Sequence, residues 1–227
     1  MTLLGEAVAQ LTALERGIAR AEARERILAA RGWSDDFLGQ ALHEQYEPRT
    51  DALGVGSYVA LVNNAHGGVV RLYAGAAVAA YGRLMLGEQS DLYDTLDPDE
   101  GFRIIARWKL SHTTNVLGDM FVNAPAWNHI HVVADTAHGP NWYIRNDNNI
   151  GVDNWEDSGV AIDTDWHVHE LAATSGRAEH LLDGALINVS TTKIPTVPMT
   201  PDMRCLARAA AARYVDLDWW TVRPQNL

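Results

Sequence analysis

The sequence predicts a mainly β protein, in which a β-sandwich follows an N-terminal helical segment. Between residues 50 and 200, short apolar runs alternate with Gly, Asn and Asp, and no run has a convincing helical period of 3.6 residues. Several short strands at regular spacing are typical of a sandwich. With 227 residues, 47% of them hydrophobic, the chain is long enough for one large β domain and an appendage.

The stretch from 160 to 187 has the clearest strand pattern. Side chains of residues 166–171 alternate between two unlike faces, as the period of two in a strand requires. Ser175-Gly176 and Asp183-Gly184 are hairpin signals, because Gly readily adopts the positive φ that such turns need. The stretch therefore predicts three consecutive strands joined by two turns.

Residues 1 to about 31 are predicted to be helical, because they lack Pro and are rich in Ala, Leu, Glu and Arg. Apolar residues recur at heptad positions over about four heptads. A narrow apolar seam suits a partner helix, so we expect a homo-oligomeric coiled coil, with a trimer favoured. The alternative is a helix packed on its own domain. The residues predicted to mediate oligomerisation are Leu4, Leu11, Leu14, Ile18 and Leu28.

The predicted domain boundary lies at Tyr46-Glu47-Pro48, because Pro48 disfavours helix and starts an extended chain. Ser34 is expected to cap a short helix that runs through Leu42. We therefore assign residues 1–47 to a helical oligomerisation or anchoring segment and residues 48–227 to the sandwich.

Composition and charge exclude several classes of function. The chain has 18 Lys and Arg against 29 Asp and Glu, a net charge of −11, which argues against nucleic acid and anionic membrane surfaces as partners. Cys205 is the single cysteine, so no intrachain disulfide forms. We expect no signal peptide, and no run approaches the ~20 apolar residues of a membrane span.

Several motifs carry a resemblance to a known superfamily. They are the Trp166-His167 pair that opens a strand, the turn Leu182-Asp183-Gly184-Ala185-Leu186, the terminal VDLDWWTVRP, and the earlier GGVVRLYAG and GFRIIARWKL. In this order they resemble the concanavalin A-like lectin/glucanase superfamily, including laminin-G-like modules. The resemblance covers roughly residues 50–227 and implies a jelly-roll β-sandwich.

The superfamily includes glucanases, which carry an acidic cluster of the form Glu-x-Asp-x-Glu on one strand face. At the corresponding place this sequence reads NWYIRNDNN and has one carboxylate, Asp147. The pairs Asp163-x-Asp165 and Asp216-x-Asp218 provide no third carboxylate. We therefore predict that the protein is not an enzyme. A glycoside hydrolase or lyase of the glucanase-like fold is the third alternative.

Aromatic and amide side chains are interleaved in segments that look like loops. Aromatic faces stack on sugars, and amides form hydrogen bonds with hydroxyl groups. This pattern predicts a carbohydrate-binding surface, with packing or partner contact as the alternative. The candidate residues are Trp127, Asn128, Trp142, Asp147, Asn149 and Trp155.

Metal ligands are a weaker possibility, and no cofactor is predicted. His129-x-His131 and His167-x-His169 each place two imidazoles on one strand face, and the four could bind zinc if those faces met. The segment NDNNIGVDNWEDSG supplies oxygen ligands for calcium, although such runs are more often plain turns. The weak calcium candidates are Asp147, Asn149, Asp153 and Asp157.

A coiled coil joined to a lectin-like sandwich resembles the virion appendages of tailed bacteriophages. The function predicted from the sequence is non-catalytic recognition of a cell-surface polysaccharide by an oligomeric head spike or tail fibre. The alternative is a purely structural capsid or tail decoration protein that makes protein–protein contacts. The expected partners are other copies of the chain, a polysaccharide and other virion proteins, and the expected location is the virion, with the cytoplasm as the alternative.

Overall fold

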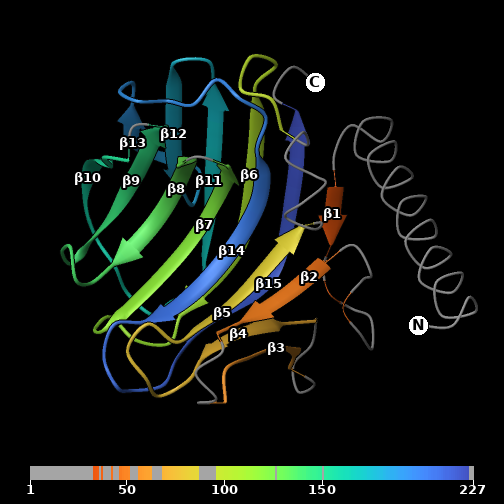
Figure 1. The fold of residues 1–227 in the computed structure, drawn as a ribbon, viewed down its shortest axis with the longest axis vertical. Helices are drawn as coiled ribbons and strands as arrows, with labels where there is room; N and C mark the ends of the chain where they lie inside the picture. The colour runs from red at the N-terminus through yellow and green to blue at the C-terminus, as the bar shows by residue number, and fades with distance from the viewer. Residues whose placement is uncertain are drawn as a thin grey trace, which may run out of the picture.

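The computed structural model describes residues 33–35, 37, 42, 46–51, 56–62, 68–86, 96–125, 127–149 and 151–224. These residues form two stacked β-sheets, and no helix occurs among them (Figure 1). None of them belongs to a helix long and apolar enough to cross a membrane. The mainly β sandwich predicted from the sequence is confirmed, and its two-sheet architecture is consistent with a jelly roll.

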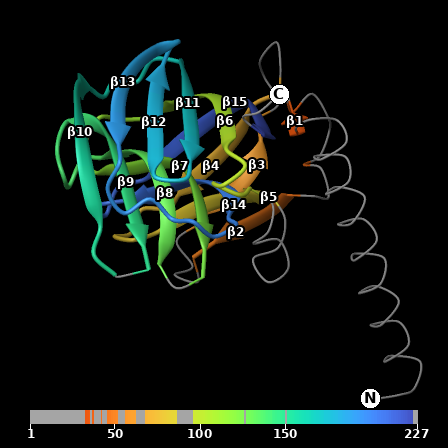
Figure 2. The same cartoon turned by 90° about the horizontal axis from the view of Figure 1, so that it is seen from above.

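Neighbouring strands in both sheets are antiparallel, and the sheets face each other as two layers (Figure 2). Sheet A contains, in spatial order, β13 (Ala185–Ser190), β12 (Arg177–Leu182), β11 (His167–Thr174), β6 (Phe102–Leu110), β15 (Arg213–Pro224), β4 (Val70–Ala74) and β3 (Tyr58–Leu61), with β1 (Trp33–Asp35) beside β15. Sheet B contains β10 (Asn154–Ala161), β9 (Asn141–Asn148), β8 (Asn128–Asp135), β7 (Val116–Ala124), β14 (Thr200–Ala207), β5 (Tyr81–Leu86) and β2 (Tyr46–Thr50).

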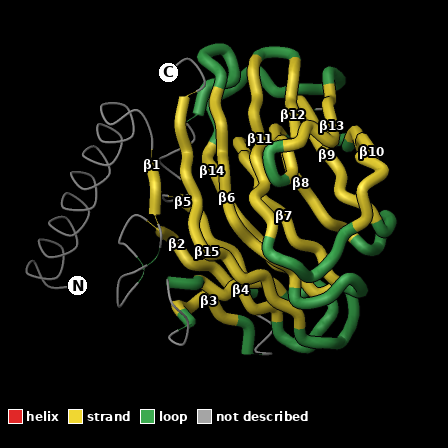
Figure 3. The backbone as a smooth tube through the Cα atoms, turned by 180° about the vertical axis from the view of Figure 1, so that it is seen from behind, coloured by secondary structure: helices red, strands yellow, loops and turns green. Residues whose placement is uncertain are grey.

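The two predicted hairpins are present in sheet A, as the tube in Figure 3 shows from behind. β11, β12 and β13 are joined by turns in which Gly176 and the pair Asp183-Gly184 have positive φ. Local turn chemistry therefore places these strands correctly.

The region before residue 48 differs from the prediction. Residues 33–35 form strand β1, which pairs with β15, and β2 already begins at Tyr46. Tyr46 is buried and its hydroxyl accepts a hydrogen bond of 2.6 Å from the Trp220 indole. The expected helix start at Ser34 is therefore wrong, because pairing with the long β15 captures this segment. The predicted oligomerisation residues Leu4 to Leu28 lie outside the described residues.

The interior between the sheets holds two buried histidines. His169 Nδ1 and His180 Nε2 are 3.1 Å apart, and both side chains are fully buried beside Trp108 and Trp142. Within the described part of the chain, His169 Nε2 and His180 Nδ1 have no hydrogen-bond partner. Burial lowers the pKa of both, that of His180 to about 3, so the folded protein keeps this pair neutral at neutral pH.

Because this histidine pair stays neutral in the folded protein, we expect the free energy of unfolding to fall in acid. Unfolded histidines take up protons near pH ~6.5, which the folded pair does not, so the free energy of unfolding should fall as pH drops below that value. Replacing His180 with Leu should reduce this slope by about 1.4 kcal/mol per pH unit, because one fewer proton is taken up on unfolding. Urea unfolding between pH 7.5 and 4 measures the slope, and His112→Gln, at an exposed histidine, is the control. An unchanged slope in His180→Leu would contradict the prediction.

Candidate active site

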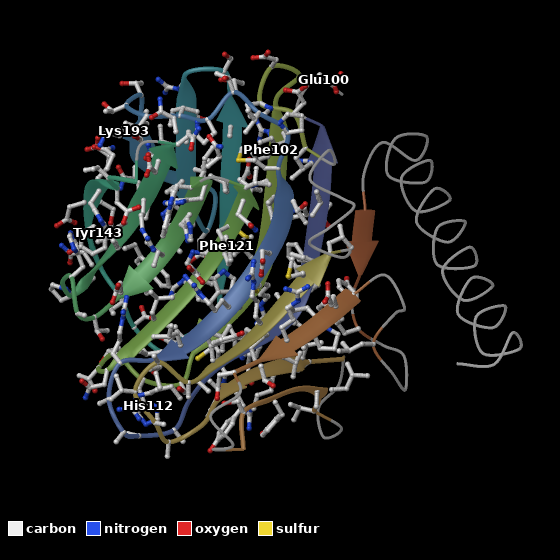
Figure 4. The ribbon with its side chains drawn as sticks, in the orientation of Figure 1. Glu100, Phe102, His112, Phe121, Tyr143 and Lys193 are labelled. Carbon is white, nitrogen blue, oxygen red and sulfur yellow. The ribbon has the colours of Figure 1, made fainter. Side chains whose placement is uncertain are left out.

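The outer face of sheet B carries an unusual set of charged side chains. Strand alternation sends Met120, Val122 and Ile130 into the core, so their sequence neighbours project from the opposite face. We call this set the outer-face cluster; it contains Arg83 (β5), Asp119, Phe121 and Asn123 (β7), His129 and His131 (β8), and Asp202 and Arg204 (β14). Figure 4 labels Phe121 near the middle of sheet B and Tyr143 on its β9–β10 side.

The register of three adjacent strands sets the spacing of the cluster. Asp202 lies opposite Phe121, and Phe121 lies opposite His131, so these three side chains form one row across β14, β7 and β8. In the next row Arg204 lies opposite Asp119. Because neighbouring strands are about 4.8 Å apart, Asp202 and His131 are separated by about 10 Å at the backbone.

Asp119 is a fully buried carboxylate with several donors. The Arg204 guanidinium donates from Nε to Oδ1 at 3.2 Å and from Nη2 to Oδ2 at 2.6 Å, and His131 Nδ1 lies 2.8 Å from Oδ2. Burial alone would raise the pKa of Asp119, but the positive charge of Arg204 and the His131 hydrogen bond hold it well below its usual value. Asp119 is therefore ionised and accepts hydrogen bonds only.

Asp202 is equally buried, but its pKa is shifted in the opposite direction. Its Oδ2 accepts hydrogen bonds from Arg83 Nε at 2.6 Å and, more weakly, from Asn123 Nδ2 at 3.4 Å. Its Oδ1 has no hydrogen-bond partner among the described residues. Burial raises the pKa of Asp202 to about 6 against the influence of Arg83. Asp202 can therefore hold a proton at mildly acidic pH, and Oδ1 is the oxygen free to carry it.

His131 stacks on Phe121, with ring centroids 4.4 Å apart and an interplanar angle of 3°. Burial lowers its pKa well below the usual value, which outweighs the hydrogen bond to Asp119. Because Asp119 is an acceptor, the proton of the neutral ring must sit on Nδ1, which leaves Nε2 as a lone-pair acceptor. His129 lies edge-on to His131, at a centroid distance of 4.7 Å.

Toward β10 the same face carries a second ion cluster beside aromatic residues. Asp153 accepts hydrogen bonds from His129 Nε2 at 2.9 Å and makes an ion pair with Arg145 Nη2, also at 2.9 Å. The Arg145 guanidinium lies over Trp155, whose ring stacks on His138 at a centroid distance of 4.0 Å. This end of the face therefore joins aromatic rings to hydrogen-bonding groups, and His138 and Arg145 both lie against the Trp155 ring.

The six predicted sugar-binding residues do not form one site. Trp127 is 68% exposed, and Asn128, Asp147 and Asn149 lie at the same end of the β8–β9 pair. Trp142, however, points into the core, where it packs edge-on to Trp108 at 5.3 Å. The prediction for Trp142 is therefore wrong, because strand alternation turns its ring away from solvent.

The remaining predicted sugar-binding side chains differ in their exposure to solvent. Asn128 is buried and donates from Nδ2 to the Pro125 carbonyl at 2.9 Å, while Asp147 is also buried. Asn149 is exposed in the turn after β9, with a positive φ. Trp155 lies further along the face, opposite Arg145.

The weak calcium candidates also do not converge. Asp153 is engaged by His129 and Arg145, and Asp157 accepts from Asn141 Nδ2 at 3.0 Å. Asp157 pairs with Tyr143, four residues along β9 from Asp147, which corresponds to about 13 Å. The histidine pairs are likewise separated, since His131 lies on the outer face of sheet B and His169 lies in the core.

The segment compared above with the glucanase acidic motif forms strand β9. Its outward positions are Tyr143, Arg145 and Asp147, so the face of this strand holds one carboxylate, as the sequence indicates. The two carboxyl groups with opposed ionisation instead lie on β7 and β14, at Asp119 and Asp202. Sequence reasoning missed them, although Asp119-x-Phe121-x-Asn123 and Asp202-x-Arg204 have the period of two expected of polar side chains on a strand face.

Comparison with solved structures identifies the fold. A β-1,3-1,4-glucanase (lichenase) from a mouse hindgut metagenome is similar with a TM-score of 0.61 and 15% identity, over 85% of this chain and 99% of that one. The Bacillus licheniformis β-glucanase has a TM-score of 0.59 and 12% identity, over 86% and 98% of the two chains. A structure from work on endo-acting O-glycanases of the human gut microbiota has a TM-score of 0.62 and 13% identity, over 85% and 98%. No family model and no curated protein matches the chain.

These comparisons correct the predicted function. The similar structures are two-sheet sandwiches of glycoside hydrolases, including family 16 endo-glucanases. They contradict the expectation of a non-catalytic recognition protein and of a chain that is no enzyme. At 12–15% identity they show the fold alone, and this fold favours the third alternative, a glycoside hydrolase of the glucanase-like fold, over the other two. The expectation rested on a search for the acidic motif along one strand, which did not consider carboxyl groups on neighbouring strands.

Proposed function

We propose that this protein is a glycoside hydrolase that cleaves a polysaccharide on the outer face of sheet B. The observation that carries the proposal is the pair Asp119 and Asp202, two buried carboxyl groups on adjacent strands whose environments push their pKa values apart. Asp202 can then hold a proton at a pH at which Asp119 stays ionised, so an acid lies beside a fixed negative charge. The shared fold of known glucanases supports the same class of reaction.

Asp202 is the proton donor in this proposal. Glycosidic bonds break when a carboxylic acid protonates the leaving oxygen, and an acid whose pKa lies near the working pH does this best. Arg83 binds Oδ2 of the buried Asp202 and is itself partly exposed, with 18% of its side chain accessible, so it is the neighbour of Asp202 that can move. A bound sugar must therefore displace this long, rotamer-rich side chain to reach Oδ1, and the hydroxyl groups of the sugar would replace its hydrogen bond.

The aromatic end of the face extends the site along a chain of sugars. Trp155, which is partly exposed, lies on the β9–β10 side of the cluster and packs against the buried Tyr143, so its exposed part would contact a polymer that crosses the strands. A polysaccharide of several residues is thus a better substrate than a disaccharide.

The test is an assay of reducing-end release from a panel of glycans. The panel contains mixed-linkage β-1,3-1,4-glucan, β-1,3-glucan, xylan and mucin O-glycans, each with the full-length chain at pH 5 to 8. We expect cleavage of at least one polymer, fastest near or below pH 6, where Asp202 is protonated. Binding without the release of any reducing ends would overturn the proposal in favour of a recognition protein.

A further inference from the structure

The geometry points to His131 as the general base of this site, which activates the attacking water through Nε2, so that hydrolysis proceeds by a single displacement with inversion. This inference rests on the proposed function and adds the identity of the base and the stereochemical outcome. It differs from a double displacement, in which a carboxylate attacks the sugar and forms a covalent intermediate.

Asp119 is poorly placed to act as that nucleophile. Both of its oxygens accept hydrogen bonds from the Arg204 guanidinium, and Oδ2 also contacts His131 Nδ1. A carboxylate engaged in this way has a low pKa and little free lone-pair capacity. Asp119 instead fixes the His131 ring and its tautomer, so it is a positioning residue.

His131 is neutral and its ring is held in one orientation. Its ring is held between Phe121, on which it stacks, and Asp119, which binds Nδ1. Among the described residues no hydrogen bond engages Nε2, so this nitrogen remains an acceptor. An imidazole oriented by a carboxylate in this manner is a general base of the kind that activates a hydroxyl or a water.

The backbone spacing of acid and base is compatible with inversion. Asp202 and His131 lie in one row with Phe121 between them, so about two strand spacings, or about 10 Å at the backbone, separate them. Inverting hydrolases keep their two groups about 6.5–9.5 Å apart to leave room for a water, whereas retaining enzymes keep them about 5–5.5 Å apart. Because Phe121 lies between Asp202 and His131 in this row, the two residues are not direct neighbours, which is closer to the wider arrangement than to the shorter one.

Bond formation and bond cleavage at the anomeric carbon occur in one step. The water oxygen bonds to the anomeric carbon while the bond between that carbon and the glycosidic oxygen breaks. One water proton passes to His131 Nε2, and the Asp202 proton passes to the leaving oxygen. Afterwards His131 loses its proton to solvent and Asp202 regains one, which restores the site.

The first test uses the free protein and needs no substrate. Two-dimensional ¹⁵N–¹H NMR of the histidine side chains at pH 7, with His131→Gln to assign the signals, reports the tautomer. We expect His131 to be neutral with its proton on Nδ1. A proton on Nε2, or a charged ring, would overturn the assignment of His131 as the base.

The second test follows the anomeric proton of the first product by ¹H NMR during cleavage of the glycan that the panel identifies. A β-linked substrate should give the α-anomer first, and His131→Gln should lower the rate by about 10²–10⁴-fold. His112→Gln removes an exposed histidine and is the matched control, with the urea midpoint of each variant as the check on folding. A β-anomer, or a folded His131→Gln variant of normal rate, would overturn the inference while the proposed function stands. Absence of cleavage by the unaltered protein overturns the proposed function itself.

Discussion

Replacing Asp202 with Asn is expected to lower the rate of glycan cleavage by about 10²–10⁴-fold, the usual contribution of a general acid. The amide keeps the shape of the carboxyl group and can still accept a hydrogen bond from Arg83, but it cannot donate a proton to the leaving oxygen. Initial rates of reducing-end release by Asp202→Asn and by the unaltered protein measure the effect.

The loss of the acid also changes how the cleavage rate depends on pH. Asp202 must be protonated to act, and its pKa is raised to about 6, so the activity of the unaltered protein should decline as pH rises above about 6. Asp202→Asn should show no such decline in its residual activity. A substrate with a dinitrophenyl leaving group, which departs without protonation, should be affected much less than a polysaccharide. Equal losses on both substrates would indicate that Asp202 does not act as the acid.

Asp202→Asn should lose activity without unfolding. A carboxyl group whose pKa is raised by burial destabilises the fold increasingly as pH rises from its unfolded value near ~3.9 to its folded value. Removing that ionisation relieves the penalty, although Arg83 loses its partner. Asp202→Asn should therefore remain folded at pH 7, and a cooperative urea transition would separate a catalytic loss from an unfolded chain.

The sequence specified those parts of the fold that depend on neighbours along the chain. Gly176 and the Asp183-Gly184 turn set two hairpins, because positive φ is a local requirement that Gly meets without strain. Alternation predicted that His169 and Leu171 share a face, and both are buried in the core. The same rule could not place Trp142, since an apolar run is compatible with either face until the partner sheet is known.

The site depends instead on pairings between distant segments. β14 inserts between β7 and β5, which brings Asp202 beside residues about 80 positions earlier and sets Arg204 opposite Asp119. Nothing in the local pattern of residues 201–206 indicates which strand will be its neighbour. A search for several carboxylates on one strand therefore overlooked two carboxyl groups that the sheet order brings together.

The Arg204–Asp119 pair predicts the largest effect on stability. Asp119 is fully buried, and Arg204 contributes two of its hydrogen bonds and its counter-charge. Replacing Arg204 with Met leaves a buried carboxylate with His131 as its remaining donor, which should lower the free energy of unfolding at pH 7 by about 3–5 kcal/mol. Urea unfolding measures this loss. It should shrink toward pH 5, because protonation of the orphaned Asp119 becomes easier.

Two further variants distinguish a buried charge from simple loss of packing. Arg103→Met removes a more exposed ion pair, whose Nη1–Oε1 distance to Glu170 is 2.5 Å, with 35% of the Arg103 side chain accessible, and should cost about 1 kcal/mol or less. The double variant Arg204→Met, Asp119→Leu removes the charge together with its partner and should recover most of the lost stability. If Arg204→Met were no more harmful than Arg103→Met, Asp119 would not be a buried ion, and the support that fixes the His131 tautomer would be lost. Stability and mechanism are thus tied to the same carboxylate, because the charge that is costly to leave unpaired is also the one that orients the base.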